Sequence, residues 1–256
     1  MTVNRTKFQK IEIVQRKDHA QDLWSIRVRP EKPLVFQAGQ YATLACNDGR
    51  RLLERPYSIV SSPLETEIEF FFELVPHGGL TPALRKMQVG ETLLMRRQAK
   101  GRFTFDKTSG HKNHFLVATV TGVAPFVSMV RTLALEGRNG RPRGHQVLVL
   151  QAASRSWEFA YREEFEALAR QSSWFKYVPT VSRPWEDPSW KGEVGRAEDL
   201  LRKYLDAFGL EPSSTTTYLC GQPQMIENSR GILRRKGFQK EFIRQEIYWV
   251  PNKKAK

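Results

Sequence analysis

The chain has 256 residues, of which 40% are hydrophobic and 11% aromatic. This length allows one large domain or two moderate ones, and the composition is that of an ordinary globular protein rather than a disordered, collagen-like or low-complexity chain. The 41 Lys and Arg residues exceed the 27 acidic residues, which gives a formal net charge of +14. Such a surplus favours polyanions or an acidic protein partner through electrostatic steering.

Cysteine usage argues against a metal redox centre. Cys46 and Cys220 lie far apart in the sequence, and neither has a second thiol or a His cluster beside it. The chain therefore has the ligands for neither a zinc site nor an iron–sulfur cluster, and we expect no metal. The two thiols and the absence of an apolar leader predict a cytoplasmic protein. The longest uncharged run, 114–130, is shorter than the about 20 apolar residues that span a bilayer, so we expect no membrane segment.

The first part of the chain alternates apolar and polar residues in the manner of strands. Turn residues separate the alternating segments, and this spacing predicts an antiparallel barrel over residues 1–106. Thr81-Pro82 predicts a helix start capped by Thr81, and the free amides of such a start suit an anion, although on this motif alone a capped surface helix is the favoured interpretation. The expected strands are 8–14, 23–28, 41–45, 57–60, 68–75 and 92–95.

From residue 115 the pattern changes to short apolar runs, each followed by a segment of helical period. These runs lie at 115–117, 147–152, 177–181 and 217–220. They predict a parallel sheet with crossover helices over residues 115–256, and the polar stretch 107–114 is expected to be a linker.

A second helix start follows the first of these runs. In Thr121-Gly122-Val123-Ala124-Pro125, Gly122 permits a close backbone approach and Pro125 opens a helix. The motif lies at the carboxyl end of a parallel strand, where α/β sheets bind ligands. Alone it is neither a GxGxxG motif nor a Walker loop and has little specificity.

Five motifs follow one another along the chain, namely Gly39-Gln40-Tyr41, Arg55-Pro56-Tyr57-Ser58, Gly79-Leu80-Thr81, Thr121-Gly122-Val123-Ala124-Pro125-Phe126 and Cys220-Gly221-Gln222-Pro223-Gln224-Met225. Over residues 8–249 their order and spacing resemble the bacterial type of ferredoxin–NADP reductase. The resemblance implies an N-terminal antiparallel β-barrel that binds FAD, a Rossmann-like parallel α/β domain that binds NADP, and a C-terminal segment that covers the flavin.

On the flavin side, the resemblance implies that Arg55 binds the FAD pyrophosphate, a role suited to a bidentate guanidinium. It implies that Tyr57 stacks on the isoalloxazine ring and that Ser58 lies near the nitrogen that accepts hydride. Tyr248 and Trp249 would cover the flavin or its adenine, although a terminal strand packed on the core is the alternative for either ring. The other implied FAD contacts are Pro56, Phe71, Phe72, Glu73, Leu74, Gly79, Leu80 and Thr81.

On the nicotinamide side, Arg183 and Arg196 match the positions that hold the 2′-phosphate, which argues for NADP over NAD. A further phosphate-binding arginine of the family aligns with Ser154, so a shift of one residue is needed before Arg155 can serve. Cys220 matches the cysteine beside the nicotinamide, with a buried small thiol as the alternative. The implied catalytic residues are Tyr57, Ser58, Cys220 and Tyr248, and the remaining NADP contacts are Thr121, Gly122, Ser182, Gln222, Pro223, Gln224 and Met225.

The sequence departs from the family at two places. Val120 stands where many relatives have Gly, and its β-branched side chain is expected to restrict the backbone or the approach of the nicotinamide. Residues 250–256 extend beyond Trp249 as a Lys-rich tail, which must turn away or act as a lid if the aromatic pair covers the flavin.

The resemblance implies hydride transfer from NADPH to FAD, followed by two single-electron transfers to ferredoxin or flavodoxin. These carriers are acidic, which fits the net charge, and we expect a monomer. A reductase of an oxygenase system is the alternative enzyme. A basic module that binds nucleic acid or an anionic surface is the alternative of another class, but no nucleic-acid motif accompanies the charge. The candidate docking residues, each of which is alternatively a solvated charge, are Arg50, Arg51, Arg96, Arg97, Lys100, Arg102, Arg234, Arg235 and Lys236.

Overall fold

The computed structural model describes residues 7–47, 52–137 and 144–247. The chain forms two compact units, the first made of Met1–Phe105 with Ala124–Gly140 and the second of Asp106–Val123 with Arg141–Lys256. Helix α2 (Ala124–Glu136) therefore belongs to the first unit, although it follows the first strand of the second.

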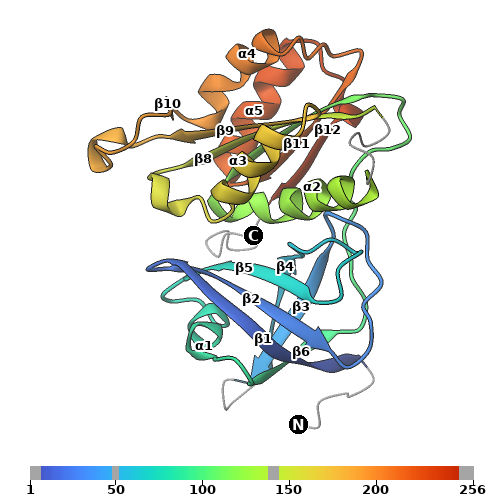
Figure 1. Ribbon diagram of the computed structural model, residues 1–256, viewed down its shortest axis with the longest axis vertical. Helices are drawn as coiled ribbons and strands as arrows, with labels where there is room; N and C mark the ends of the chain where they lie inside the picture. The colour runs from blue at the N-terminus through green and yellow to red at the C-terminus, as the bar shows by residue number, and fades with distance from the viewer. Residues whose placement is uncertain (1–6, 48–51, 138–143, 248–256) are drawn as a thin grey trace, which may run out of the picture. The chain divides into compact units, whose positions relative to one another are not determined.

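The first unit is built on an antiparallel sheet whose described strands follow the order β4-β3-β6-β1-β2-β5 (Figure 1). An isolated bridge between Ile59 and Phe70 links the two edge strands, so the sheet curls into an incompletely closed barrel. The expected antiparallel architecture is confirmed. The strands are β1 (Phe8–Ala20), β2 (Leu23–Pro30), β3 (Tyr41–Asn47), β4 (Leu52–Ser58), β5 (Ile68–Glu73) and β6 (Thr92–Arg96).

The core of the first unit follows from strand alternation. In β1, Ile11 and Ile13 are buried while Glu12 between them is exposed, because successive side chains point to opposite faces of a strand. Trp24 of β2 stacks on Phe72 of β5 with ring centroids 5.3 Å apart, which fills the barrel interior.

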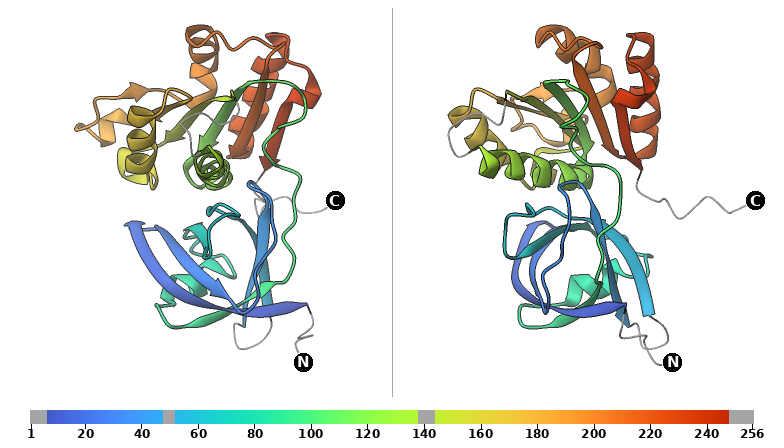
Figure 2. Two further views of the ribbon diagram at one scale, coloured as in Figure 1. Left: turned by 45° about the vertical axis from the view of Figure 1, so that its right-hand side comes forward. Right: turned by 90° about the vertical axis from the view of Figure 1, so that its right-hand side faces the viewer.

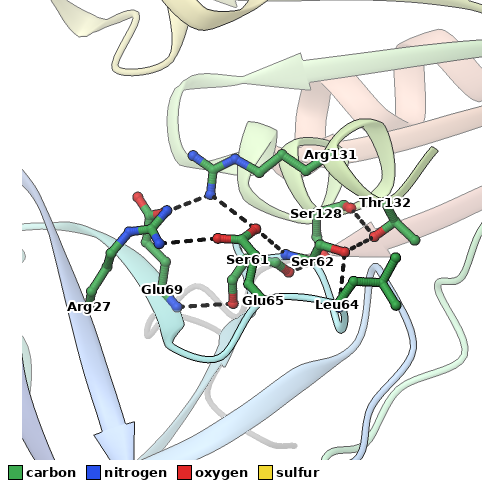
Figure 3. A network of polar contacts seen from close by, with 9 residues as sticks. All are labelled: Arg27, Ser61, Ser62, Leu64, Glu65, Glu69, Ser128, Arg131 and Thr132. Atoms are coloured by element: carbon green, nitrogen blue, oxygen red, sulfur yellow. Dashed lines mark hydrogen bonds and ion pairs between the residues drawn. The ribbon is translucent and has the colours of Figure 1, made fainter. Parts of the chain in front are cut away.

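Helix α2 packs on the barrel through polar contacts (Figure 3). Ser128 Oγ donates a hydrogen bond of 2.7 Å to the carbonyl oxygen of Ser61. Arg131 Nη1 lies 2.6 Å from Glu69 Oε2, and the same oxygen accepts a bond of 3.0 Å from Arg27 Nη2. The nearly buried Glu69 carboxylate thus joins two strands and the helix.

The second unit contains a parallel sheet in the order β10-β9-β8-β7-β11-β12 among its described strands. Helices α4 and α5 pack on one face through a cluster that includes Leu201 and Leu233, and Phe165 of α3 contacts Phe175 and Tyr177 on the other (Figure 2). The expected parallel α/β arrangement is confirmed. Its elements are β7 (Asn113–Thr119), β8 (Gln146–Ala153), α3 (Arg162–Gln171), β9 (Phe175–Val181), β10 (Glu193–Val194), α4 (Ala197–Ala207), β11 (Thr215–Gly221), α5 (Pro223–Arg235) and β12 (Ile243–Ile247).

Three details differ from the sequence-based expectations. The strand expected at 57–60 is β4, which ends at Ser58, and strands β10 and β12 were not expected. The end of the expected linker lies in β7, and its beginning is ordered by Asp106, whose Oδ1 accepts bonds from the backbone of Thr108 and Ser109.

None of the helices in the described ranges has the length and apolarity needed to cross a bilayer. In the same ranges, no group of three or more His, Cys, Asp or Glu side chains is arranged to hold a metal ion.

Candidate functional site

Strand β4 presents the first group of expected residues. Arg55 and Tyr57 are two residues apart in the strand and therefore lie on the same face. Arg55 is exposed, and its Nη1 donates a 2.7 Å bond to the carbonyl oxygen of Glu54. The half-buried ring of Tyr57 lies edge-on to Phe72, with centroids 4.8 Å apart and planes at 70°. Burial raises the pKa of Tyr57 against the opposing charge of Arg55, so the phenol stays neutral.

The neighbouring residues are less exposed. Ser58 is buried at the end of β4, and Pro56 is exposed between Arg55 and Tyr57. In β5, Phe71 and Phe72 are buried and Glu73 is exposed; Leu74, directly after the strand, is half-buried. This strand supplies core packing, and its exposed end at Glu73 is the part open to a ligand.

Helix α1 (Thr81–Lys86) corrects one expectation. Leu80, not Thr81, is the N-cap residue, and no side chain caps this helix. The Thr81 hydroxyl is buried and instead accepts a 3.1 Å bond from the backbone N–H of Val75. The predicted Thr81 cap is therefore wrong, because that hydroxyl closes the preceding loop.

The start of α1 nevertheless lies beside β4. A Cβ on Gly79 would be 3.3 Å from Leu53 Cδ1, so the glycine packs closely against the strand that carries Arg55. The first amides of a helix have no partner within the helix. The exposed guanidinium of Arg55 and these amides are hydrogen-bond donors that fit a pyrophosphate. The half-buried ring of Tyr57 offers an aromatic surface that fits a flavin ring.

In the second unit, the carboxyl ends of β7 and β11 meet at the switch point of the sheet. Strand β8 lies on one side of β7 and β11 on the other, the arrangement that opens a ligand crevice in α/β sheets. A Cβ on Gly122 would lie 2.3 Å from the carbonyl oxygen of Cys220, and one on Gly221, at φ +127°, would lie 2.1 Å from Thr119 Oγ1. The predicted close approach at Gly122 is thus made to the backbone of β11.

Val120 holds the turn between β7 and α2 in an unusual conformation. Its φ is +39°, and it is the only residue other than glycine with positive φ among the described residues. Its half-buried side chain packs against a small cluster that includes Phe159 and Trp190. A β-branched residue strongly disfavours positive φ, so the backbone at Val120 is strained. The packing of its side chain helps to hold this conformation.

The loop after β11 is fixed by Gln222. Its backbone N–H donates a 2.8 Å bond to Thr119 Oγ1, and its side chain accepts a 3.3 Å bond from the N–H of Met225 as the N-cap of α5. Pro223 opens the helix, Gln224 is exposed, and Met225 is buried. Cys220 is buried and Thr121 half-buried, so the edge of the site consists largely of backbone.

The arginines expected to bind phosphate gather around one carboxylate. Arg155 Nη2 forms an ion pair with Glu186 Oε2, and Arg183 Nη1 lies 3.5 Å from Glu186 Oε1. Arg155 Nη1 also lies 3.2 Å from Glu158 Oε1. Arg155 and Arg183 therefore share an anionic partner.

Ser182 and Ser154 are direct chain neighbours of Arg183 and Arg155, and both are held by hydrogen bonds. Ser182 donates from both its N–H and its hydroxyl to the carbonyl oxygen of Ala153, and the Ser154 N–H donates to Glu158. Arg196 is exposed at the N-cap position of α4.

Four expected residues lie outside the described ranges, namely Tyr248, Trp249, Arg50 and Arg51. Arg96 of the expected docking set pairs with Glu54, and Lys236 pairs with Asp206. The other docking candidates, Arg97, Lys100, Arg102, Arg234 and Arg235, are exposed.

Three residues of this edge were not predicted. Glu186 is the shared partner of two arginines, and Trp157 and Trp185 are exposed by 50% and 72%. A sequence signal for Glu186 lies in the segment Ser182-Arg183-Pro184-Trp185-Glu186. Glu186 comes three positions after Arg183, and a tight turn at this spacing brings the carboxylate to the guanidinium group.

Comparison with known proteins agrees with this division. Residues 10–105 match the oxidoreductase FAD-binding domain and residues 116–231 the oxidoreductase NAD-binding domain. The ferredoxin–NADP reductase of Pseudomonas aeruginosa is 28% identical over 225 residues, which cover 82% of this chain and 83% of that protein. The reductase component of phenol 2-monooxygenase from a Pseudomonas species is also 28% identical, over 87% of this chain and 61% of that protein.

Among solved structures, a ferredoxin NADP⁺ reductase from Neisseria gonorrhoeae superposes with a TM-score of 0.83 at 24% identity, covering 95% of this chain and 99% of that one. The two sheets, their order and the two domain matches define a two-domain oxidoreductase that uses FAD and a nicotinamide dinucleotide. In sequence, the chain is similar to ferredoxin–NADP reductases, at 28% identity to those of Pseudomonas aeruginosa and Azotobacter vinelandii. The expected cofactors are thereby confirmed as FAD and NAD(P).

Proposed function

We propose that this protein oxidises NADPH and passes the electrons one at a time to an acidic ferredoxin or flavodoxin. The observation that carries the choice of NADPH is the convergence of Arg155 and Arg183 on one anionic group at the carboxyl edge of a parallel sheet. Two guanidinium groups around one position suit the 2′-phosphate that distinguishes NADP from NAD. Arg196, at the start of α4, is the third candidate contact.

The residues of the chain bind and orient the cofactors. Arg55 and the amides at the start of α1 bind the pyrophosphate of FAD, and the neutral Tyr57 ring packs on the flavin. When bound, the flavin accepts a hydride and releases single electrons. In the first unit, Ser58 is the candidate residue beside the flavin. In the second unit, Cys220 is the candidate residue beside the nicotinamide, and Thr121 with Gly122 and the start of α5 bind the dinucleotide backbone. Tyr248 and Trp249 remain candidates for covering the flavin.

The proposed partner follows from charge. A formal net charge of +14 attracts an acidic carrier and raises the rate of association at low salt. One relative is the reductase component of phenol 2-monooxygenase. A dedicated oxygenase component is therefore the second candidate for the electron acceptor.

A carrier assay tests the proposed function. The flavin-loaded protein is mixed with NADPH and either a ferredoxin or a flavodoxin, and reduction of the carrier is followed by absorbance under nitrogen. We expect carrier reduction that depends on NADPH and slows as ionic strength rises, because salt screens the attraction. Oxidation of NADPH with neither carrier reduced, or carrier reduction insensitive to salt, would contradict the proposed partner.

A further inference from the structure

The carboxylate of Glu186 lies between the two arginines assigned to phosphate binding. Its Oε2 pairs with Arg155 Nη2, and its Oε1 lies 3.5 Å from Arg183 Nη1. Each carboxylate oxygen is thus directed to a different guanidinium group. A two-oxygen anion held by two arginines is also how these side chains would hold a phosphate.

The neighbouring Glu158 makes different contacts. Its Oε2 accepts a 2.8 Å bond from the N–H of Ser154 and a 3.4 Å bond from the N–H of Arg155, and only its Oε1 contacts a guanidinium. Glu158 therefore orders the turn after β8. Desolvation alone would lower the pKa of Arg155, but the hydrogen bonds and charges of Glu186 and Glu158 outweigh it, and the pKa is raised above its ordinary value. The guanidinium is thus already engaged by acidic groups before any ligand arrives.

We propose that Glu186 is a specificity-determining residue that competes with the 2′-phosphate of NADP for Arg155 and Arg183. This inference rests on the proposed function, because it assigns these arginines to NADP. A 2′-phosphate must displace the carboxylate or share the guanidinium groups with it, and both anions repel each other. NAD carries an uncharged hydroxyl at this position, so it does not compete with the carboxylate for the two guanidinium groups. Glu186 therefore reduces the preference for NADPH over NADH.

Two exposed tryptophans beside this cluster provide an optical signal. The guanidinium carbon of Arg155 lies 5.7 Å from the centroid of the Trp157 ring, and Trp185 directly precedes Glu186 in the chain. Displacement of the Glu186 carboxylate or binding of an adenine nucleotide there changes the surroundings of both indole rings. Tryptophan fluorescence thus reports binding independently of electron transfer.

The test uses the flavin-loaded Glu186→Gln variant, which keeps the size of the side chain and removes its charge. Adenosine 2′,5′-bisphosphate and adenosine 5′-monophosphate are titrated against the variant and the unmodified protein, with affinity measured by tryptophan fluorescence and by calorimetry. We expect the bisphosphate to bind about fivefold more tightly to the variant, the scale of two weakened exposed ion pairs. The monophosphate should change less than about twofold, and the gain should shrink at high salt.

The matched control is Glu211→Gln. Glu211 is an exposed residue just before the amino end of β11, at the opposite edge of the sheet, and its substitution makes the same change in net charge. We expect no gain for the bisphosphate in this control. In an Arg155→Ala background, Glu186→Gln should give a smaller gain, because one of the two competed guanidinium groups is gone.

Equal bisphosphate affinity in the Glu186→Gln variant and the unmodified protein would overturn the competition and leave the proposed function standing. An equal gain in the Glu211→Gln control would also overturn it, because net charge alone would then be responsible. Failure of the bisphosphate to bind any of the proteins would overturn the assignment of these arginines to NADP together with the inference. Retained flavin absorbance and far-UV circular dichroism verify that each variant is folded.

Discussion

Val120 has an unfavourable backbone conformation in the turn that connects β7 to α2. Its φ of +39° is unfavourable for a residue with a Cβ by roughly 1–2 kcal/mol, whereas glycine has no such penalty. Removing the side chain also removes its packing against the Phe159 and Trp190 cluster. Val120→Ala and Val120→Gly both lose that packing, but only the glycine variant relieves the backbone.

We therefore expect Val120→Gly to be more stable than Val120→Ala by roughly 1 kcal/mol, measured by urea unfolding of the flavin-loaded proteins. At an ordinary position the order is the reverse, because glycine loses more chain entropy on folding. An alanine variant as stable as the glycine variant would show that this turn is not strained.

Arg55 is the residue on which flavin retention should depend most. Loss of a charged hydrogen-bond donor to a phosphate costs about 1.5–3 kcal/mol, so Arg55→Ala should bind FAD roughly 10–100-fold more weakly in a fluorescence titration. The control is Arg29→Ala, which removes an exposed arginine of the same barrel that pairs with Glu67. If both variants retain flavin equally, Arg55 does not contact the pyrophosphate.

The residues of the candidate site differ in how well the sequence alone predicts them. Arg55 and Tyr57 were found through a motif whose members are adjacent in the chain, and strand alternation then places them on one face. The shared partner of Arg155 and Arg183 was not found, because Glu186 contacts an arginine 31 positions earlier only after β9 and its turn have formed. Thr81 was misassigned because a capping hydroxyl and a loop-closing hydroxyl have the same local sequence.

At the scale of elements, Glu69 connects helix α2 to two barrel segments. Its side chain is 7% exposed and contacts both Arg27 and Arg131, while Glu65 lies 3.1 Å from the first and 3.9 Å from the second. Removing one charge from such a network leaves two half-buried guanidinium groups partly unpaired. The remaining carboxylate of Glu65 compensates in part.

We expect Glu69→Gln to lower the free energy of unfolding by about 2 kcal/mol in urea denaturation at pH 7. Glu67→Gln is the matched substitution, since Glu67 pairs with Arg29, whose side chain is 62% exposed, and it should cost less than about 1 kcal/mol. Equal losses in the two variants would mean that the contacts of α2 with the barrel add little stability.

The parallel sheet contains a buried histidine that should make the second unit sensitive to acid. His114 Nε2 lies 2.9 Å from His145 Nδ1, and His114 Nδ1 lies 3.2 Å from the hydroxyl of Tyr218. Burial, followed by the charge of His145, lowers the pKa of His114 to about 3. The folded protein therefore keeps this ring neutral at pH values where the unfolded chain binds a proton.

The resulting stability is fully present above the unfolded pKa of about 6.5 and is lost as the pH falls toward 3. We expect the unfolding free energy to drop by up to about 1.4 kcal/mol per pH unit between pH 6 and 4 from this group. The slope should be smaller in His114→Gln, measured by urea unfolding at several pH values. An unchanged slope would assign the acid sensitivity to other groups.

Elements were predicted where their pattern was local. The apolar runs of β7, β8, β9 and β11 indicated a parallel sheet because both faces of these strands are covered. Strand β10 has two residues, and in β12 only Ile243 is buried and polar or charged residues follow it, so neither strand produced an apolar run. The membership of α2 in the first unit depends on contacts between residues more than 60 positions apart, such as Ser128 with Ser61.

For the whole molecule, the order of the two sheets along the chain agrees with the two oxidoreductase domains that it matches. An antiparallel unit followed by a parallel unit, each matched by its own oxidoreductase domain, gives the molecule one half for flavin and one for the dinucleotide. The identity of the carrier is not encoded in this architecture. It depends on how charge is distributed over the surface. The sequence shows a total of +14, and a total charge attracts any acidic partner rather than one in particular.

The central claim is that NADPH reduces a flavin held by this chain, and an anaerobic titration followed by visible absorbance tests it most directly. The purified protein is loaded with FAD, freed of excess flavin and titrated with NADPH. We expect a protein-bound flavin band that is bleached by about one equivalent of NADPH, since each hydride carries two electrons to one flavin. A bound flavin whose band is unchanged by NADPH, or a protein that retains no FAD, would contradict the account.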